Sequence, residues 1–591
     1  MASWKRSIEC GVVSEKNLNK EITLNGWVAR RRDHGGLIFV DIRDRTGIMQ
    51  IVFDPDTSKE AHSLAQNVRD EFVISVKGLV VARSQETVNE KMPTGKWELR
   101  VSSMIILGGA KQLPFAIDEV TTVDEELRLR YRYLDLRRFT MQQKLALRNI
   151  VIFTMREFFV KNGFFEIETP LLTKNTPGGA REFLVPSRLH TGSFYALPQS
   201  PQIYKQLLMA AGMERYFQIA RCFRDEDLRA DRQPEFTQLD IEMSFIEQED
   251  VRGLIEAMLG HVFKSVFNIE IKNAFPVLSY EQAFGFYGSD KPDLRYGMPI
   301  HLATPLFKNT ELSFLKEAIA RGGQVGALRV ENKLFTRSEL DTLVAKAQEL
   351  GSKGLLYVRW SEDGILESPV AKFLQPDFFE QAALTFNGLT KKDTLFFVAG
   401  SYKEAWTVLG KLRNHLAELL GLVDPQMIHF SWVVDFPLFE YDEKTKTMNS
   451  AHHPFTAPAE GWQVVEPSQM KAQAYDLVCN GVEAGGGSIR ITTKDVQQKI
   501  FDLLGLTKEQ SQEKFGFLLE AFDYGFPPHG GIALGIDRLI MILSGSSSIR
   551  EVIAFPKTQR GYDLMMNAPT SVDSNSLKEY GITIKGDKKD L

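Results

Sequence analysis

Between residues 21 and 107, apolar and polar positions alternate in short segments that are separated by turn-forming residues. Each segment fits a strand that buries one face, because successive side chains on a strand point to opposite sides. The predicted strands cover residues 22–28, 35–44, 47–53, 71–83 and 96–107, and residues 58–69 fit one helix. Such a run of short strands favours a small closed barrel, of which the OB type is the best fit.

Apolar residues at helical spacing follow the barrel region. They predict a long helix over residues 142–162 that ends at Gly163, and a strand over residues 164–169 that Pro170 closes. A polar connector rich in arginine and tyrosine, residues 125–138, precedes the helix and indicates a hinge.

A second change of pattern spans residues 297–421. Predicted helices over 311–321 and 337–350 alternate there with predicted strands over 354–360 and 393–400, which indicates an α+β domain. We interpret this domain as an insertion, because the most site-like residues lie on both sides of it.

The densest mixture of charges is the stretch 223–240. Its flanks, 216–220 and 236–245, have the character of two antiparallel strands, so the charged residues form the loop between them. Arg224, at the end of the first strand, can present paired donors to a phosphate. The alternative is a solvated hairpin with surface ion pairs, and this segment alone does not decide between the two.

Composition limits the classes of protein that remain. A chain of 591 residues requires several domains, and its net charge of −5 argues against a protein that coats nucleic acid nonspecifically. The three cysteines, Cys10, Cys222 and Cys479, fit neither a disulfide framework nor a zinc site and indicate a reducing compartment. The sequence has no apolar run of membrane-spanning length, so we expect a cytoplasmic protein without a membrane partner.

Three segments in order, 163–170, the Arg224 hairpin and 531–539, resemble the signature motifs of class II aminoacyl-tRNA synthetases. Segments 199–206, 451–456 and 481–490 make the resemblance specific to the bacterial-type aspartyl-tRNA synthetase family of subclass IIb, over nearly the whole chain. The resemblance implies ATP-dependent activation of L-aspartate to aspartyl-adenylate and its transfer to the 3′ end of tRNA(Asp). The P-loop pattern GxxxxGK[ST] is absent from the sequence, so it does not offer a competing nucleotide site.

The family organisation implies an α+β protein with an antiparallel-sheet catalytic domain. We expect an OB-fold anticodon-binding domain over 1–110, a hinge over 111–140, catalytic parts over 141–295 and 426–565, the inserted α+β domain over 296–425, and a C-terminal extension and tail over 566–591. The first catalytic part contains motifs 1 and 2, and the second contains motif 3. The strand near Pro170 resembles the dimer element of the family, which implies a homodimer.

The resemblance also implies the ATP site. Arg224 bridges the α-phosphate and the substrate carboxylate, Arg538 holds the γ-phosphate, and Phe236 stacks on adenine. The implied catalytic residues are Arg224, Arg538 and Glu483, and the implied ATP-binding set is Arg224, Asp225, Glu226, Gln233, Phe236, Glu483, Gly535, Ile536, Asp537 and Arg538. Without the family, Phe236 would be interpreted as a core residue.

Asp476 and Glu483 are the expected ligands of Mg²⁺, since hard oxygen ligands suit that ion. For Asp476, an ion pair with a nearby arginine is nearly as good an interpretation.

The substrate side chain is an anion, which Lys205 and Arg490 can neutralise. We expect asparagine to leave both cations without a counter-charge, at a cost of roughly 2–5 kcal/mol. The full implied aspartate-binding set is Ser200, Gln202, Lys205, Arg224, Asp240, His452, His453 and Arg490. One departure from the family is Gly178, which stands where a glutamate commonly reaches the substrate ammonium, so the detail of this lid loop stays open.

On the barrel, Phe39 is expected to stack on an RNA base, while Gln50 and Glu98 hydrogen-bond base edges. The implied anticodon-binding set is Arg30, His34, Phe39, Gln50 and Glu98. His34 favours charging of tRNA(Asn) in addition to tRNA(Asp), and Glu86 argues against it, so both outcomes stay open.

Three other functions compete with an aspartate enzyme. An asparagine enzyme has no use for two cations in the pocket, and a regulator without catalysis would be expected to lack Arg224, Glu483 or Arg538. A protein that uses only the barrel to bind RNA would leave most of the chain without a role.

Overall fold

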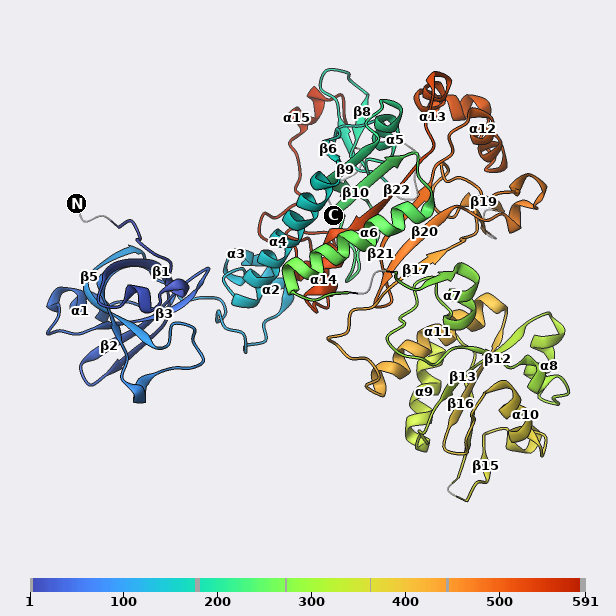
Figure 1. Ribbon diagram of the computed structural model, residues 1–591, viewed down its shortest axis with the longest axis horizontal. Helices are drawn as coiled ribbons and strands as arrows, with labels where there is room; N and C mark the ends of the chain where they lie inside the picture. The colour runs from blue at the N-terminus through green and yellow to red at the C-terminus, as the bar shows by residue number, and fades with distance from the viewer. Residues whose placement is uncertain (1–3, 176–180, 272–273, 362, 443–445, 585–591) are drawn as a thin grey trace. The chain divides into compact units, whose positions relative to one another are not determined.

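The computed structural model describes residues 4–175, 181–271, 274–361, 363–442 and 446–584. The chain forms two compact units (Figure 1). The first contains Met1–Ala146, Ala554–Thr558 and Tyr562–Pro569, and the second contains Leu147–Ile553, Gln559–Gly561 and Thr570–Leu591. Within the described ranges, no helix combines the length and the apolar character that crossing a membrane requires.

The first unit is built on a closed barrel whose strands follow the order β1-β2-β3-β5-β4. Their bounds are β1 (Glu21–His34), β2 (Leu37–Asp44), β3 (Gly47–Phe53), β4 (Val73–Ala82) and β5 (Trp97–Gly108), with α1 (Lys59–Gln66) between β3 and β4. Burial alternates strictly along β2, where Ile38, Val40 and Ile42 face the interior. The predicted OB-type barrel is therefore confirmed.

The segment for which the sequence predicts a hinge contains a cluster of arginines around one carboxylate. Asp135, which is fully buried, pairs with Arg128 at 2.9 Å, Arg132 at 2.7 Å and Arg138 at 3.4 Å. These residues lie on or beside α2 (Glu125–Arg130) and α3 (Arg132–Asp135). Arg132 also donates from Nε to the carbonyl of Ala554 at 2.9 Å, which ties the hinge to a late part of the chain.

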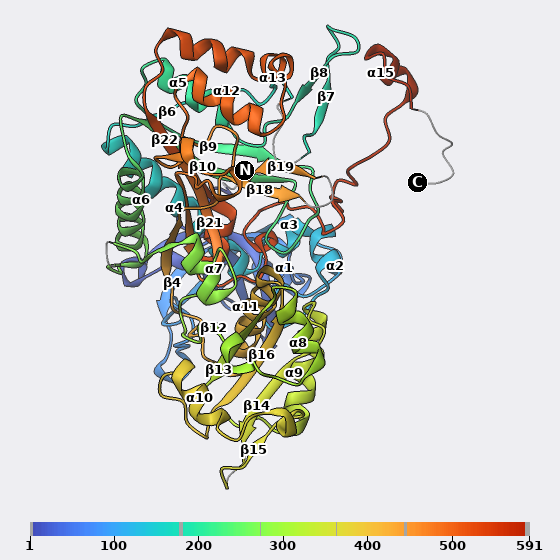
Figure 2. The same cartoon turned by 90° about the vertical axis from the view of Figure 1, so that its right-hand side faces the viewer.

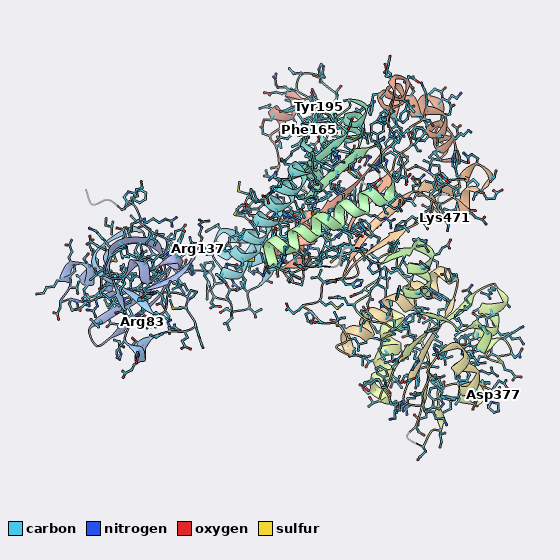
Figure 3. All side chains as sticks on the ribbon, viewed as in Figure 1. Arg83, Arg137, Phe165, Tyr195, Asp377 and Lys471 are labelled. Carbon is cyan, nitrogen blue, oxygen red and sulfur yellow. The ribbon has the colours of Figure 1, made fainter. Side chains whose placement is uncertain are left out.

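A second buried carboxylate, Glu71, joins the hinge to the barrel. It pairs with Arg43 at 2.7 Å and with Arg137 at 2.8 Å. The guanidinium of Arg137, labelled in Figure 3, also lies 5.1 Å from the ring centroid of Trp27. Because Glu71 is only 4% exposed, both cations are held in a weakly screened environment.

The second unit contains an eight-stranded sheet in the order β11-β17-β20-β21-β22-β10-β9-β6. The six central strands are antiparallel, and the two edge strands, β11 and β6, run parallel to their neighbours. Their bounds are β6 (Phe165–Glu166), β9 (Arg215–Phe223), β10 (Glu235–Ser244), β11 (Val277–Ser279), β17 (Phe430–Val434), β20 (Ala474–Cys479), β21 (Val482–Ile489) and β22 (His529–Gly535).

One face of this sheet carries the main core. The helices α4 (Phe139–Lys161), α6 (Gln248–Val262) and α14 (Ile536–Leu543) pack on it (Figure 1). Along β10, Leu239, Ile241 and Met243 enter this core, so the residues between them point to the opposite face. The helix predicted over 142–162 is confirmed as α4, whereas the strand predicted over 164–169 reduces to the two residues of β6.

A second sheet of five strands, in the order β12-β13-β16-β14-β15, lies in the segment for which the sequence predicts an inserted domain (Figure 2). One of its faces packs on α9 (Arg337–Glu349) and α11 (Tyr402–Leu419), and the other packs on α8 (Ser313–Ala320) and α10 (Phe378–Thr385). The strand bounds are β12 (His301–Leu302), β13 (Gln324–Val330), β14 (Leu356–Trp360), β15 (Leu366–Glu367) and β16 (Thr394–Gly400). Helices and strands both occur in this segment, as the pattern predicts, while its separation as a domain stays a prediction.

The second unit contains further helices and two hairpins. They are α5 (Gln202–Ala210), α7 (Tyr280–Tyr287), α12 (Lys494–Leu503), α13 (Lys508–Ala521) and α15 (Ser574–Glu579), with hairpins β7 (Leu184–Pro186) to β8 (Phe194–Ala196) and β18 (Phe439–Asp442) to β19 (Thr447–Ser450).

Candidate functional site

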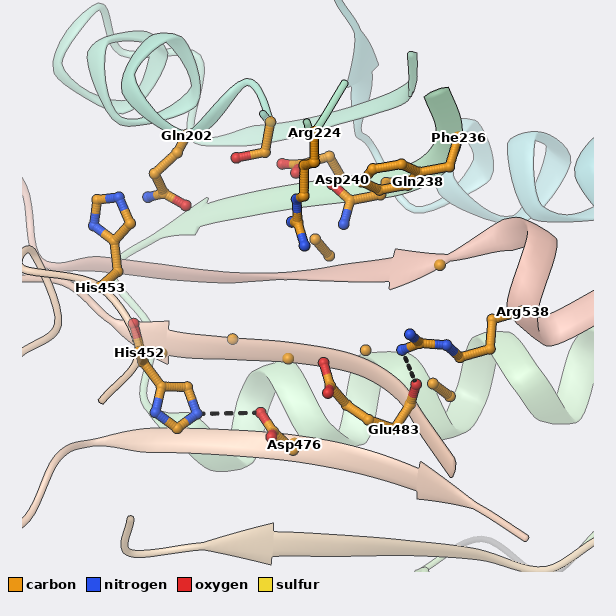
Figure 4. Close-up of a pocket in the computed structure, with 18 of the residues that line it drawn as sticks. Gln202, Arg224, Phe236, Gln238, Asp240, His452, His453, Asp476, Glu483 and Arg538 are labelled. Carbon is orange, nitrogen blue, oxygen red and sulfur yellow. Dashed lines mark hydrogen bonds and ion pairs between the residues drawn. The ribbon is translucent and has the colours of Figure 1, made fainter. Parts of the chain in front are cut away.

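A cavity of about 550 Å³ opens on the face of the eight-stranded sheet opposite the main core. Its walls come from α5, β10, β20, β21, β22 and the first turn of α14, and Figure 4 shows side chains from these elements pointing into one space. The predicted residues that line it are Ser200, Gln202, Lys205, Arg224, Glu226, Gln233, Phe236, Asp240, His452, His453, Asp476, Glu483, Arg490, Gly535, Asp537 and Arg538.

Strand β10 contributes to the cavity through alternate residues. Phe236, Gln238 and Asp240 line it, and Glu242 lies on the same face one step further along the strand. Gln238 and Glu242 were not predicted from the sequence. Each lies two residues from Asp240 on a predicted strand and therefore on the same face, which could have identified both.

Lys205 and Arg490 meet at the buried end of the cavity. Lys205 is 1% exposed, and its Nζ lies 2.8 Å from Asp240 Oδ1 and 3.1 Å from Glu242 Oε2. Arg490 donates to both oxygens of Glu242, at 2.9 and 3.2 Å, and to Ser488 Oγ at 2.6 Å. One carboxylate, Glu242, therefore organises both cations.

This arrangement corrects one expectation from the sequence. Lys205 and Arg490 have counter-charges, Asp240 and Glu242, before any ligand binds. A neutral ligand would consequently not leave them without partners. What the two cations offer a ligand is a surface made only of hydrogen-bond donors, since neither side chain can accept.

The charges at this end of the cavity set the protonation of their neighbours. Burial raises the pKa of Glu242, but Arg490 and Lys205 outweigh burial and lower it from 4.5 to about 2. Burial raises the pKa of Asp240, and Lys205 opposes that effect. Burial, followed by the positive charges of Arg490 and Lys205, lowers the pKa of His453 to about 3, so its imidazole is neutral at pH 7.

Two further arginines face the middle of the cavity. The guanidinium of Arg224 lies over the ring of Phe236, 5.0 Å from its centroid. Arg538 donates from Nη1 to the carbonyl of Glu483 at 2.6 Å, as Figure 4 shows, and from Nη2 to Asp231 Oδ2 at 3.2 Å. Asp231 lines the cavity and was not identified from the sequence, because nothing in its spacing separates it from the other charged residues of its loop.

Asp476 and Glu483 come from the adjacent strands β20 and β21 and converge above Gly486. A Cβ atom at Gly486 would lie 2.6 Å from Asp476 Oδ1 and 3.8 Å from Glu483 Oε1, so any other residue there would displace the Asp476 carboxylate. Asp476 contacts His452 Nε2 at 3.4 Å rather than an arginine. Burial raises the pKa of Asp476, and the hydrogen bond from His452 lowers it.

The carboxylate pair fits an ion that takes few ligands from protein. Among the described residues, no group of three or more His, Cys, Asp and Glu side chains could hold a metal by itself. Mg²⁺ is commonly bound by one or two carboxylates together with substrate phosphates. The carboxylates of Asp476 and Glu483 match this mode of coordination.

Three predicted ATP residues have other surroundings. Asp537 borders the cavity, but its carboxylate accepts from the Thr237 backbone N–H at 2.7 Å and pairs with Arg148 of α4. Ile536 is fully buried in the main core. Asp225 is exposed, and its backbone N–H donates to the Arg181 carbonyl at 3.0 Å. Gly178, the departure in the predicted lid, lies outside the described residues.

On the barrel, the structure brings the predicted base readers together. Gln50 donates to Glu98 at 3.2 Å and accepts from Arg32 at 3.3 Å, and Phe39 lies opposite Arg32 in the pairing of β1 with β2. Arg30 and His34 are exposed on the same hairpin. Phe39, half-buried beside these polar groups, leaves part of its ring accessible.

The chain is similar to known proteins in sequence and in fold. A family model described as tRNA synthetases class II (D, K and N) matches residues 124–559, and one described as OB-fold nucleic acid binding domain matches residues 22–107. A protein of Heliobacterium modesticaldum named aspartate–tRNA(Asp/Asn) ligase is 51% identical over 584 residues, which cover 98% of this chain and 96% of that protein. A Bacillus licheniformis protein named aspartate–tRNA ligase is 51% identical over 586 residues, 98% of this chain and 99% of that protein.

Among solved structures, asparaginyl-tRNA synthetase from Pyrococcus horikoshii complexed with asparaginyl-adenylate matches with a TM-score of 0.59 at 20% identity. The match covers 93% of this chain and 98% of that one. At this identity the likeness concerns the fold alone.

Proposed function

Because the chain belongs to the class II tRNA synthetases (D, K and N), we propose that it activates L-aspartate with ATP and transfers the aspartyl group to tRNA. The observation that carries the proposal is the buried pair of donors, Lys205 and Arg490, at one end of a cavity that Arg224 and Arg538 also line. Such a cavity accepts an amino acid with an anionic side chain at one end and a nucleotide triphosphate at the other.

In the first step, an oxygen of the substrate α-carboxylate attacks the α-phosphorus of ATP, and the bond from that phosphorus to the bridging oxygen of pyrophosphate breaks. Arg224 lies between the two anions and reduces their repulsion, while Arg538 binds the terminal phosphate. Phe236 stacks on the adenine. In the second step a hydroxyl of the tRNA 3′ end attacks the carbonyl carbon of aspartyl-adenylate, and AMP leaves.

Asp476 and Glu483 would hold Mg²⁺, which neutralises phosphate charge when bound. These carboxylates, from the adjacent strands β20 and β21, would hold the ion. Asp476 is in turn oriented by His452.

Selectivity against asparagine follows from donor geometry. An aspartate side chain accepts hydrogen bonds from both Lys205 and Arg490, whereas the amide nitrogen of asparagine would place its own donors against theirs. A buried donor without an acceptor costs roughly 1–3 kcal/mol, or about 5- to 150-fold in selectivity. Ser200, Gln202 and Asp240 are the proposed contacts of the substrate ammonium.

The barrel is the proposed anticodon reader for tRNA(Asp), through Phe39, Gln50 and Glu98, and the proposed location of the reaction is the cytoplasm. Charging of tRNA(Asn) is a second candidate function. The exposed His34 and relatives named for both tRNAs favour it, and Glu86 is the residue that counts against it. Aspartate attached to purified tRNA(Asn) at a rate near that for tRNA(Asp) would establish it, and negligible charging would refute it.

A second copy of the chain is the proposed partner of an apolar surface on α4 and β6. Phe153, Val160 and Phe165 are each about 60% exposed there, and Phe165 is labelled in Figure 3. Large exposed apolar side chains that gather on neighbouring elements mark interaction surfaces. Sedimentation at micromolar concentration should give a dimer, and replacement of Phe153 by Glu should give a monomer.

The reaction is tested by amino-acid-dependent exchange of labelled pyrophosphate into ATP across the twenty amino acids. Aspartate should stimulate exchange, and Lys205→Met should reduce its kcat/KM at least about 30-fold, or about 2 kcal/mol, while ATP binding persists. Stimulation by asparagine in place of aspartate would contradict the proposal.

A further inference from the structure

Arg538 makes contacts on two sides. Its Nη1 donates to the backbone carbonyl of Glu483 at 2.6 Å, and its Nη2 contacts Asp231 Oδ2 at 3.2 Å. The carbonyl belongs to the sheet and stays in place. The carboxylate belongs to the loop between β9 and β10, and its side chain is 40% exposed, so this second contact is the replaceable one.

The loop is anchored close to Asp231. The carbonyl of Ala230 accepts from the Ile549 backbone N–H at 3.0 Å and from Ser548 Oγ at 3.2 Å. These two bonds hold the neighbouring backbone against the body of the second unit. Asp231 can therefore leave and regain Arg538 by a change of its own side chain, without movement of the loop.

Other carboxylates of the loop do not compete for Arg538. Glu226 pairs with Arg232 at 3.0 Å, and Asp227 is exposed to solvent. Among the described carboxylates of the loop, Asp231 alone contacts this guanidinium, and it occupies a donor, Nη2, that could bind a phosphate oxygen.

We infer that Asp231 and the terminal phosphate of ATP exchange places on Arg538. Asp231 partners the guanidinium when the site is empty, leaves when the γ-phosphate binds, and returns as pyrophosphate departs. Asp231 is thus a positioning residue that lowers the affinity for the triphosphate end and speeds pyrophosphate release. The inference rests on the proposed function, because it takes Arg538 as the γ-phosphate ligand.

Asp231→Asn in the full-length protein tests the exchange, with Asp227→Asn as the matched control. Both changes remove one negative charge from the same loop, but only the first removes the contact with Arg538. We expect Asp231→Asn to lower the Kd for ATP about two- to five-fold, the range expected for one partly exposed ion pair. The Kd for AMP, which lacks the γ-phosphate, should not change.

Pyrophosphate exchange supplies the kinetic readout. The KM for ATP should fall in Asp231→Asn while kcat also falls, and inhibition by added pyrophosphate should strengthen. Equal effects on ATP and AMP, an unchanged Kd for ATP, or the same effects in Asp227→Asn would overturn the inference. If the wild-type protein bound no ATP, the proposed function would fail, and this inference with it.

Discussion

Glu242 determines how the pocket cations are presented. Because its two oxygens accept from Lys205 and Arg490 at once, each cation keeps part of its donor set directed toward the cavity. The site is therefore preorganised, and substrate binding does not have to gather the two side chains. A buried pair of cations without Glu242 would repel each other.

Because of His453, at this end of the pocket, the free energy of unfolding should depend on pH. Its pKa is about 3 in the folded protein, so below pH 6.5 the unfolded chain takes a proton that the folded protein does not. The stability that neutral His453 contributes is complete above pH 6.5 and is lost as the pH falls toward 3. The free energy of unfolding of the wild type should fall by up to about 1.4 kcal/mol per pH unit from this group.

His453→Asn should remove that slope while keeping an acceptor for the Phe455 backbone N–H, which His453 Nδ1 accepts at 3.3 Å. Urea denaturation of both proteins at pH 6.5 and pH 5 measures the difference. Equal slopes in the two proteins would mean that His453 titrates alike in the folded and unfolded states.

At the scale of single residues, sequence motifs led to Arg224, Lys205, Arg490 and Arg538, all of which line the cavity. Two of the residues that were missed act on three of those four: Glu242 orients Lys205 and Arg490, and Asp231 contacts Arg538. Such partners come from distant parts of the chain, and only the folded sheet reveals which charge meets which.

At the scale of elements, α4 is joined to the cavity by one ion pair. Arg148 on α4 binds Asp537 at the start of α14, and Asp537 accepts from the Thr237 backbone N–H of β10 at 2.7 Å. The Asp537 side chain is only 4% exposed. Arg148→Met should cost about 3–5 kcal/mol, because it leaves a buried carboxylate without its counter-charge. Chemical denaturation of the purified protein measures this.

Arg156→Met, on the same helix, is the matched control. Arg156 pairs with Glu166 at 2.9 Å, but the two side chains are 45% and 34% exposed. Its loss should cost less than about 1 kcal/mol. Equal costs for the two variants would show that burial does not decide the value of these pairs.

Elements whose apolar residues recur at a regular spacing were predicted well, as the barrel strands and α4 demonstrate. The strand expected over 164–169 was too long, because the backbone pairs with β9 only at Phe165 and Glu166. After Glu166, Ile167 donates from its backbone N–H to the Phe217 carbonyl at 3.2 Å, and Thr169 reaches β9 through its side chain, at 3.0 Å to Gln218 Oε1. Where the backbone leaves its neighbour depends on the folded sheet, and the local pattern of residues does not show it.

At the scale of the whole molecule, the barrel and the catalytic cavity belong to different compact units. Phe39→Ala should therefore raise the KM for tRNA about 5- to 150-fold, as expected for about 1–3 kcal/mol of lost base stacking. Aspartate-dependent pyrophosphate exchange without tRNA should keep its wild-type rate. A parallel loss in both assays would contradict this division of labour.

The bond from Arg132 to the carbonyl of Ala554 has a consequence for synthesis on the ribosome. The barrel needs only the first part of the chain and can form early, as domains do during translation. The bond from Arg132 has to wait for more than four hundred further residues, since its acceptor is Ala554. A nascent chain would therefore carry a finished barrel for as long as those residues take to be made, before this contact can form.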